Sequence, residues 1–215
     1  NKCSWRGGAV NVSQAASLKL SAGTMKDNKA QDGGAISINS GVVTMEGGNL
    51  TGNSASATAG GIWVNTTRTD TAKLTMTGGE IKNNSADRDG GGINFIKGEI
   101  ELSGSPVVKE NKVKNNVLSN LFEAGNMVKV SGDLASSALV GIYSNNFVET
   151  QQFAVNSATG EPSGLNSLVN DRDESLFGAI GSFTEQIVWG NNPKDAVCKI
   201  GDKTYGSLQT AINSV

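Results

Sequence analysis

The chain has 215 residues, of which 37% are hydrophobic, 28 are glycine and only 3 are proline, and its formal net charge is −2. This composition can supply a buried core and differs from the proline- and glycine-rich composition of disordered chains. Charges of both signs are mixed without a basic stripe, which argues against a nucleic-acid partner. No apolar run approaches the ~18 residues of a membrane-spanning helix.

A sequence unit of about 25–31 residues recurs four times before residue 112. Each unit opens with two glycines and an aliphatic residue, and closes with an apolar residue three positions before an asparagine. The glycine pairs are Gly7-Gly8, Gly33-Gly34, Gly60-Gly61 and Gly91-Gly92. The asparagines are Asn28, Asn53, Asn84 and Asn111. A repeat of this length is typical of stacked solenoid coils.

Within each unit, three short apolar segments alternate with polar, glycine-bearing turns. The first two segments place apolar residues at every second position, as in Ile36/Ile38 and Val43/Met45, which is the period of a β-strand. The third segment carries the apolar residue of the closing motif, such as Leu50. Three strands per coil, stacked on their equivalents in the neighbouring coils, predict an all-β, right-handed parallel β-helix.

The closing asparagines occupy one position of this coil. Identical amide side chains that stack can form a ladder of hydrogen bonds, so we expect a structural ladder of Asn28, Asn53, Asn84 and Asn111. The alternative is that each is a solvated turn residue. The glycine pairs suit turns that need a positive φ or a close backbone approach. A phosphate-binding loop at 89–92 would need a strand before it and a helix after it, and neither is predicted.

The two cysteines do not predict a disulfide. Cys3 stands two residues after Asn1, where Ala30 and Ala55 follow the later asparagines, so we expect a buried thiol that packs like a small hydrophobic residue. Cys198 alternates with apolar neighbours and is expected to face inward as well. The two residues would lie at opposite ends of a solenoid, far beyond the ~7 Å that a disulfide spans, and two cysteines make no zinc site.

The repeat becomes irregular after Asn111, and its extent divides the chain into three expected regions. Residues 1–143 are expected to form the β-helix, 144–195 an irregular connection or cap with a strand at 185–189, and 196–215 a hairpin and the start of a helix at Ser207. The last region is either a small β-rich cap or the beginning of a following module. Because Asn1 stands at a ladder position, we expect the sequence to begin within a coil, with any export signal or anchor outside it.

Two short motifs carry a family resemblance. Gly33-Gly34-Ala35-Ile36 and the apolar-x-x-Asn pattern resemble the repeats of chlamydial polymorphic outer-membrane proteins, although those usually have Phe where this chain has Met, Leu, Ile or Val. Residues 74–84 are more similar to Gly/Asn-rich right-handed β-helix repeats in large surface proteins of anaerobic bacteria. Residues 199–212 look like the opening of another pectate-lyase-like β-helix. The resemblance implies a secreted or cell-surface bacterial protein of several domains.

From the repeat and this resemblance, we expect a non-catalytic structural or adhesive module of a large bacterial surface protein. It would need no cofactor, and its partners would be host or matrix glycans or proteins. An alternative is a carbohydrate-binding β-helix. Trp63 lies between inward-facing residues, so it should point outward beside Asn94 and could stack on a sugar. Against this, the insertion at 65–71 could fold over Trp63 and cover it.

A polysaccharide lyase or glycosidase is a further alternative. Hydrolysis of a glycosidic bond needs paired carboxylates, and the candidates are Asp32, Asp87 and Asp89, close to the glycine pairs. The structural explanation is that Asp beside Gly favours a turn, and Thr58-Ala59 interrupts the column. The same carboxylates could hold calcium, which takes six to eight oxygen ligands. We therefore predict no catalytic residue and no metal site.

Overall fold

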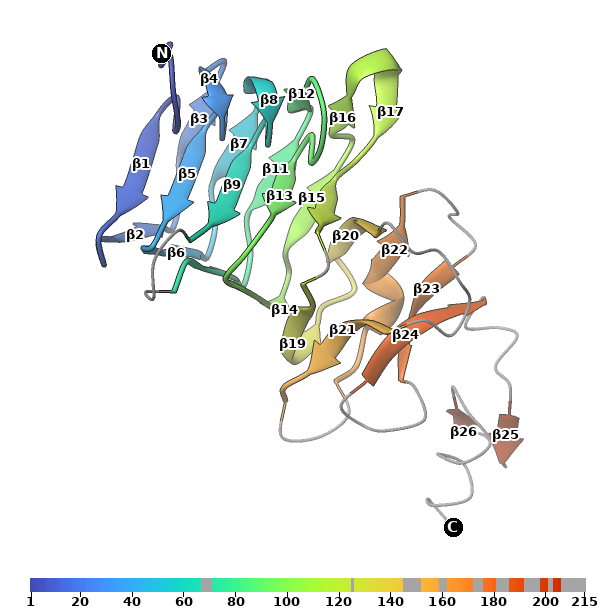
Figure 1. Ribbon diagram of the computed structural model, residues 1–215. Coiled ribbons are helices and arrows are strands. Elements are labelled where there is room, and N and C mark those ends of the chain that lie inside the picture. Colours follow the sequence, from blue (N-terminus) through green and yellow to red (C-terminus); the bar gives the residue numbers. More distant parts are fainter. Residues whose placement is uncertain are drawn as a thin grey trace.

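The computed structural model describes residues 1–66, 71–124, 126–144, 152–158, 162–171, 176–180, 186–191, 198–200 and 203–205. The chain forms a parallel β-solenoid of about five turns, which is the predicted β-helix (Figure 1). Successive coils lie side by side along the solenoid axis, and each strand pairs in parallel with its equivalent in the next coil.

Three parallel faces run along the solenoid. Face 1 contains β1 (Val10–Ser13), β5 (Ile36–Asn39), β9 (Ile62–Asn65), β13 (Ile93–Phe95) and β18 (Leu121–Glu123). Face 2 contains β2 (Ser17–Leu20), β6 (Val42–Met45), β10 (Lys73–Met76), β14 (Glu99–Gly104) and β19 (Val128–Leu134). Face 3 contains β3 (Thr24–Lys26), β7 (Asn49–Thr51), β11 (Glu80–Lys82) and β15 (Val107–Lys109).

Each coil before residue 114 has a fourth strand, which the three-strand repeat did not predict. Face 4 contains β4 (Lys29–Asp32), β8 (Ser54–Thr58), β12 (Ser85–Ala86) and β16 (Lys112–Val113). These strands begin directly after the asparagines of the repeat. Apart from Val113 they carry alanine and polar residues rather than larger aliphatic ones, so their sequence lacks the hydrophobic alternation that identifies a strand.

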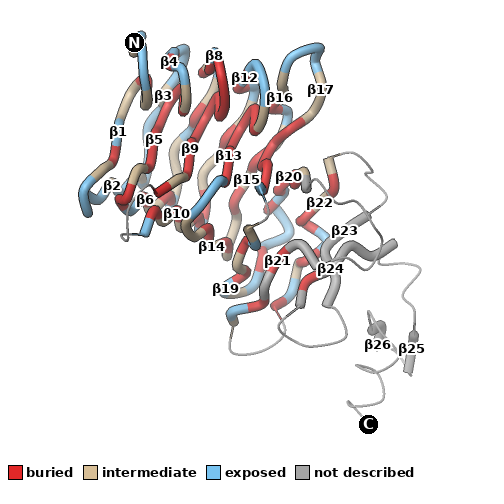
Figure 2. The backbone as a smooth tube through the Cα atoms, viewed as in Figure 1, coloured by how far each residue is buried: buried red, intermediate tan, exposed pale blue. Residues whose placement is uncertain are grey.

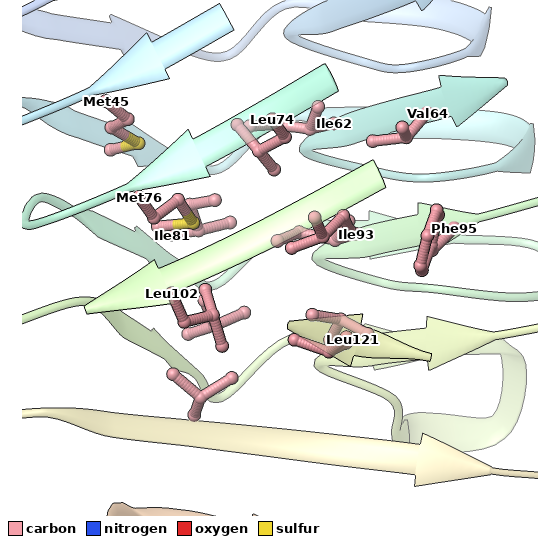
Figure 3. Packing of buried hydrophobic residues seen from close by; sticks show 14 of the residues in the cluster. Met45, Ile62, Val64, Leu74, Met76, Ile81, Ile93, Phe95, Leu102 and Leu121 are labelled. Carbon is pink, nitrogen blue, oxygen red and sulfur yellow. The ribbon is translucent and has the colours of Figure 1, made fainter. Parts of the chain in front are cut away.

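The core is a continuous cluster of buried hydrophobic residues from faces 1, 2 and 3. Buried residues recur along the strands of successive coils (Figure 2). Inward residues of equivalent strands lie one above another, as with Ile62 and Ile93 on face 1 and Met45 and Met76 on face 2 (Figure 3). The predicted inward residues of the second coil are completely buried: Ile36, Ile38, Val43, Met45 and Leu50. Ala55 is also buried but is not part of this core cluster, because it lies on face 4.

One glycine per coil is required by close packing of the backbone. Strand pairing of Val10, Ile36, Ile62 and Ile93 aligns Gly8, Gly34, Gly60 and Gly91. A Cβ on Gly34 would lie 2.3 Å from the carbonyl oxygen of Gly60 and 2.7 Å from that of Ser54. The equivalent glycine is therefore the second of the pair in the first two coils and the first of the pair in the next two. The sequence alignment of the pairs was thus wrong by one residue.

A positive φ is needed at a different position, one residue earlier. Gly7, Gly33 and Gly90 have φ values of 68°, 64° and 62°, and Ala59 takes the same position with a φ of 60°. A second positive-φ position precedes each repeat asparagine, and it is filled by Asp27, Gly52, Asn83 and Glu110. The turns therefore tolerate side chains in the left-handed region, where the surrounding coils hold the backbone in place.

The solenoid changes its construction after β16. A short 3₁₀ turn, η1 (Lys114–Asn116), leads into β17 (Val117–Leu118), which pairs antiparallel with β16 and ends face 4. In the next coil, β20 (Leu139–Ser144) pairs with β15 through its first residues and with β18 through its last ones. Face 3 therefore continues directly into face 1 without a fourth strand.

Parallel stacking extends past residue 143, into the segment that the sequence suggested was irregular. There, β21 (Gln152–Asn156) pairs with β19, and β22 (Leu168–Asn170), after the 3₁₀ turn η2 (Leu165–Ser167), pairs with β20. Two antiparallel strands follow, β23 (Leu176–Ile180) and β24 (Gln186–Asn191), and β24 covers residues 186–189 of the strand expected at 185–189. The expected hairpin is formed by β25 (Cys198–Ile200) and β26 (Lys203–Tyr205). The expected helix at Ser207 lies outside the described residues.

Replacing Gly34 by alanine should destabilise the fold strongly, because the new methyl group would overlap two carbonyl oxygens of the backbone. We expect a loss of at least ~3 kcal/mol in the free energy of unfolding, since overpacking of a rigid backbone contact is costly. The matched control is Gly132→Ala, whose Cβ would meet only the Cβ of Ser103 at 3.4 Å. Urea unfolding followed by circular dichroism measures both variants. Equal midpoints for the two would refute the close-packing explanation.

Candidate functional site

The repeat asparagines are joined into a hydrogen-bonded ladder that runs along the solenoid. The backbone N–H and the side-chain Nδ2 of each asparagine both donate to the Oδ1 of the asparagine one coil further on. These bonds link Asn28 to Asn53, Asn53 to Asn84 and Asn84 to Asn111, at 2.9–3.0 Å. The four side chains are at most 5% exposed.

The second amide hydrogen of Asn53, Asn84 and Asn111 is also satisfied within the protein. The Nδ2 of Asn84 donates to the carbonyl oxygens of Leu50 and Lys82, and the Nδ2 of Asn111 donates to those of Ile81 and Lys109. Each buried amide thereby holds two coils together and fixes the turn at its own position. Such bonds in a dry interior are strong, and chains of them polarise one another. These residues serve the framework of the solenoid.

The ladder continues through two residues that the sequence analysis missed. The N–H and Nδ2 of Asn111 donate to the Oδ1 of Asn120, and the corresponding groups of Asn120 donate to the two carboxylate oxygens of Asp171 at 2.5 and 2.6 Å. Every bond from one ladder residue to the next is donated toward the C-terminal coils, so a carboxylate is the favourable last acceptor. The apolar-x-x-Asn motif is present at 117–120, and Leu168 precedes Asp171 with the same spacing, so searching for this motif with Asn or Asp would have found both.

Trp63 and Asn94, the predicted sugar-binding residues, point away from the aliphatic core but are buried. Both lie on face 1, and their paired neighbours Ile62 and Ile93 belong to the core cluster. Each is only 2% exposed, so the prediction that Trp63 offers an open stacking surface was wrong. Residues 67–70 of the insertion that could have covered it lie outside the described residues.

Arg6 is one group that covers Trp63. Its guanidinium carbon lies 4.1 Å from the centre of the Trp63 ring and 5.4 Å from that of Trp5. An arginine over an aromatic face gains a cation–π attraction. Asp32 holds the same side chain from the next coil, with 3.8 Å between its carboxylate and Nε of Arg6. Trp63 therefore supports Arg6, and Trp5, at 61% exposure, faces solvent.

The three aspartates proposed for catalysis or calcium binding do not converge. Asp32 accepts hydrogen bonds from the backbone N–H and the hydroxyl of Thr58, at 3.2 and 2.8 Å. Within the described ranges, no three His, Cys, Asp or Glu side chains are grouped closely enough to hold a metal ion. Asp32 thus links Arg6 and Thr58, which lie in the two neighbouring coils.

No helix in the described part of the chain has both the length and the apolar character that crossing a membrane requires.

A groove runs along the outer side of face 4 and has a volume of about 500 Å³. Its floor consists of one small residue from each coil, namely Cys3, Ala30, Ala55, Ala86 and Val113. Lysines and serines of the same strands form its walls. Cys3 is a free thiol and is half-buried rather than buried as predicted, because it lies on this groove and not in the core. Its Sγ donates to the carbonyl oxygen of Arg6 at 3.5 Å.

A charged network lies on the outer side of face 2. Lys73 bridges Glu99 and Glu101 at 2.9 and 2.8 Å, and Lys129 contacts the other oxygen of Glu99 at 3.1 Å. The hydrogen bond with Glu101, together with that from Lys73, lowers the pKa of Glu99 from 4.5 to about 2. The hydrogen bond to Glu101 is also the largest cause of the raised pKa of Lys73. The network ties three coils together from outside.

Comparison with protein-family models, curated proteins and solved structures finds no significant match to this chain.

Replacing Asn84 by alanine should lower the free energy of unfolding by about 4 kcal/mol. The change leaves two buried donors of Asn53 without an acceptor, and each unsatisfied buried donor costs about 1–3 kcal/mol. The control is Asn49→Ala, which removes an exposed amide from the start of β7. Urea unfolding of both variants gives the comparison. A loss for Asn84→Ala no larger than that of the control would show that the ladder contributes little.

Acid should weaken the face 2 network between pH 4.5 and 2. The pKa of Glu99 is lowered in the folded state, so its contribution to stability is complete above pH 4.5 and disappears as the pH falls to about 2. At pH 7, Glu99→Gln should therefore be less stable by about 1 kcal/mol, a value limited by solvent screening. This difference should vanish near pH 2, whereas Glu110→Gln, at an exposed carboxylate, should show little difference at either pH. A difference for Glu99→Gln that does not depend on pH would contradict this assignment.

Proposed function

We propose that this chain is a non-catalytic structural and adhesive module of a bacterial cell-surface protein. The observation that carries the proposal is the ladder from Asn28 to Asp171, together with the stack of aliphatic residues beside it. These are the residues that define the sequence repeat, and each has a partner in the framework. The repeat therefore encodes a scaffold, and its outward side chains are left to provide contact surfaces.

The outward positions support this division of roles. On face 2, inward positions hold aliphatic residues or methionine in each coil, whereas the outward position of Thr75 is occupied by Thr44 and Glu101 in the neighbouring coils. Coils of a solenoid contact only their neighbours, so outward residues can change without disturbing the fold. A long surface of this kind suits attachment to extended or repetitive partners such as matrix glycans and glycoproteins.

An adhesion assay tests the proposal. Beads coated with the purified chain should attach under flow to surfaces carrying mucin or matrix glycoproteins, and beads coated with the heat-denatured chain should not. Incubation with a panel of polysaccharides should release neither reducing ends nor unsaturated sugars. Attachment no better than that of albumin-coated beads would overturn the adhesive role, and release of sugar products would instead favour the lyase or glycosidase alternative.

A further inference from the structure

The groove on face 4 runs across several strands and not along a single strand. Its five floor residues come from successive coils, and because neighbouring strands lie about 4.8 Å apart, it extends for about 19 Å along the axis. At its far end, β17 folds back on β16 and closes the sheet. The groove therefore has a defined length and repeats the same environment at each coil.

The charge of this groove is opposite to that of the whole chain. The net charge of the protein is −2, yet the groove is lined by Lys2, Lys29 and Lys114 and by only one acidic residue, Asp87. All three lysines are exposed, and no ion pair that neutralises them is among the salt bridges of the described residues. A positive groove on an acidic protein concentrates anionic ligands.

The remaining wall residues are suited to hydrogen bonding. The groove presents a glutamine amide and serine hydroxyls, each of which can both donate and accept. These residues are Ser4, Gln31, Ser54, Ser56 and Ser85. The floor residues between them in each strand include three alanines, Ala30, Ala55 and Ala86, which are at most 5% exposed. Polar groups with small apolar residues between them match a ring that has hydroxyls at its edge and C–H groups on its face.

A solvent-exposed indole, that of Trp5, lies next in the chain to a residue that lines the groove. Trp5 follows the wall residue Ser4, and its carbonyl oxygen accepts a hydrogen bond from the N–H of Gln31, another wall residue, at 2.8 Å. Trp5 is 61% exposed, the highest value among the exposed large hydrophobic residues of the described chain. Arg6 lies beside it, held in place by Trp63 and Asp32. Trp5 therefore offers the exposed aromatic face that Trp63 lacks.

We propose that the face 4 groove binds a linear acidic polysaccharide, with its carboxylate or sulfate groups on the lysines and one sugar ring on Trp5. This inference deepens the proposed adhesive function and rests on it. A peptide that adds as a strand needs a free sheet edge, but this groove crosses strands whose edges are paired. A single-stranded nucleic acid needs several aromatic platforms, and none of the described residues that line the groove is aromatic.

Binding by purified protein tests the proposal directly. The intact chain is titrated with heparin, with hyaluronan and with neutral dextran of similar length, in low and in moderate salt. Heparin, hyaluronan or both should bind, more weakly as salt rises, and dextran should bind much less, because the lysines supply the attraction. The tryptophan fluorescence should change on binding, and Trp5→Phe should reduce that change.

Two matched double variants locate the site. Lys29→Glu with Lys114→Glu should weaken binding at least about tenfold, since it replaces two attractions by two repulsions. Lys26→Glu with Lys97→Glu makes the same change in net charge at exposed positions away from the groove and should leave affinity within about twofold. Circular dichroism confirms that both variants are folded.

Three outcomes would overturn the groove proposal. They are no binding of either acidic polysaccharide, equal weakening by the two double variants, or tighter binding of polyglutamate or single-stranded DNA than of the polysaccharides. The adhesion assay separates this failure from that of the proposed function. If coated beads still attach while purified chain binds no acidic polysaccharide, the module is adhesive through another surface.

Discussion

The hydrogen-bonded asparagine ladder is the interaction on which the rest of the solenoid depends. Each Oδ1 accepts from both the backbone and the side chain of the preceding coil, so one residue fixes the position and the orientation of the next coil. The ladder also continues beyond β16, where the coils no longer have a fourth strand. Asn120 enters it from the β16–β17 hairpin, and Asp171 ends it with a charge that complements the direction of the donors. Gly141 leaves room for this junction, because a Cβ there would overlap both side chains.

Close approach of backbones is the second constraint, and it explains the glycines better than turn geometry does. Ala59 takes a positive-φ position that glycine occupies in the other coils, whereas the neighbouring position, represented by Gly34, is glycine in each of the four repeats. Backbone strain of about 1–2 kcal/mol can be tolerated when the surrounding structure holds the residue in place. A Cβ within 2.5 Å of a carbonyl oxygen cannot be tolerated without moving a coil.

Face 4 connects these constraints to function. Its strands start at the ladder and end at the close-packed glycines, so its small floor residues follow the repeat of the framework. The lysines and serines that line the groove lie at positions where the framework imposes no residue type. Trp63, by contrast, contacts Arg6 and is buried, so its ring is not an accessible binding surface. A structural repeat can thus create a periodic surface without any motif for binding.

The sequence by itself determined the β-helix, its inward residues and the four ladder asparagines of the repeat, because each follows from spacing within one coil. Residues such as Ile36, Met45 and Leu50 are buried at the expected positions for this reason. Only the tertiary structure decided the fourth strand, the roles of Asn120 and Asp171, and the burial of Trp63. These features depend on contacts between residues of different coils, such as the 4.1 Å approach of Arg6 to Trp63, and local periodicity carries no information about such distances.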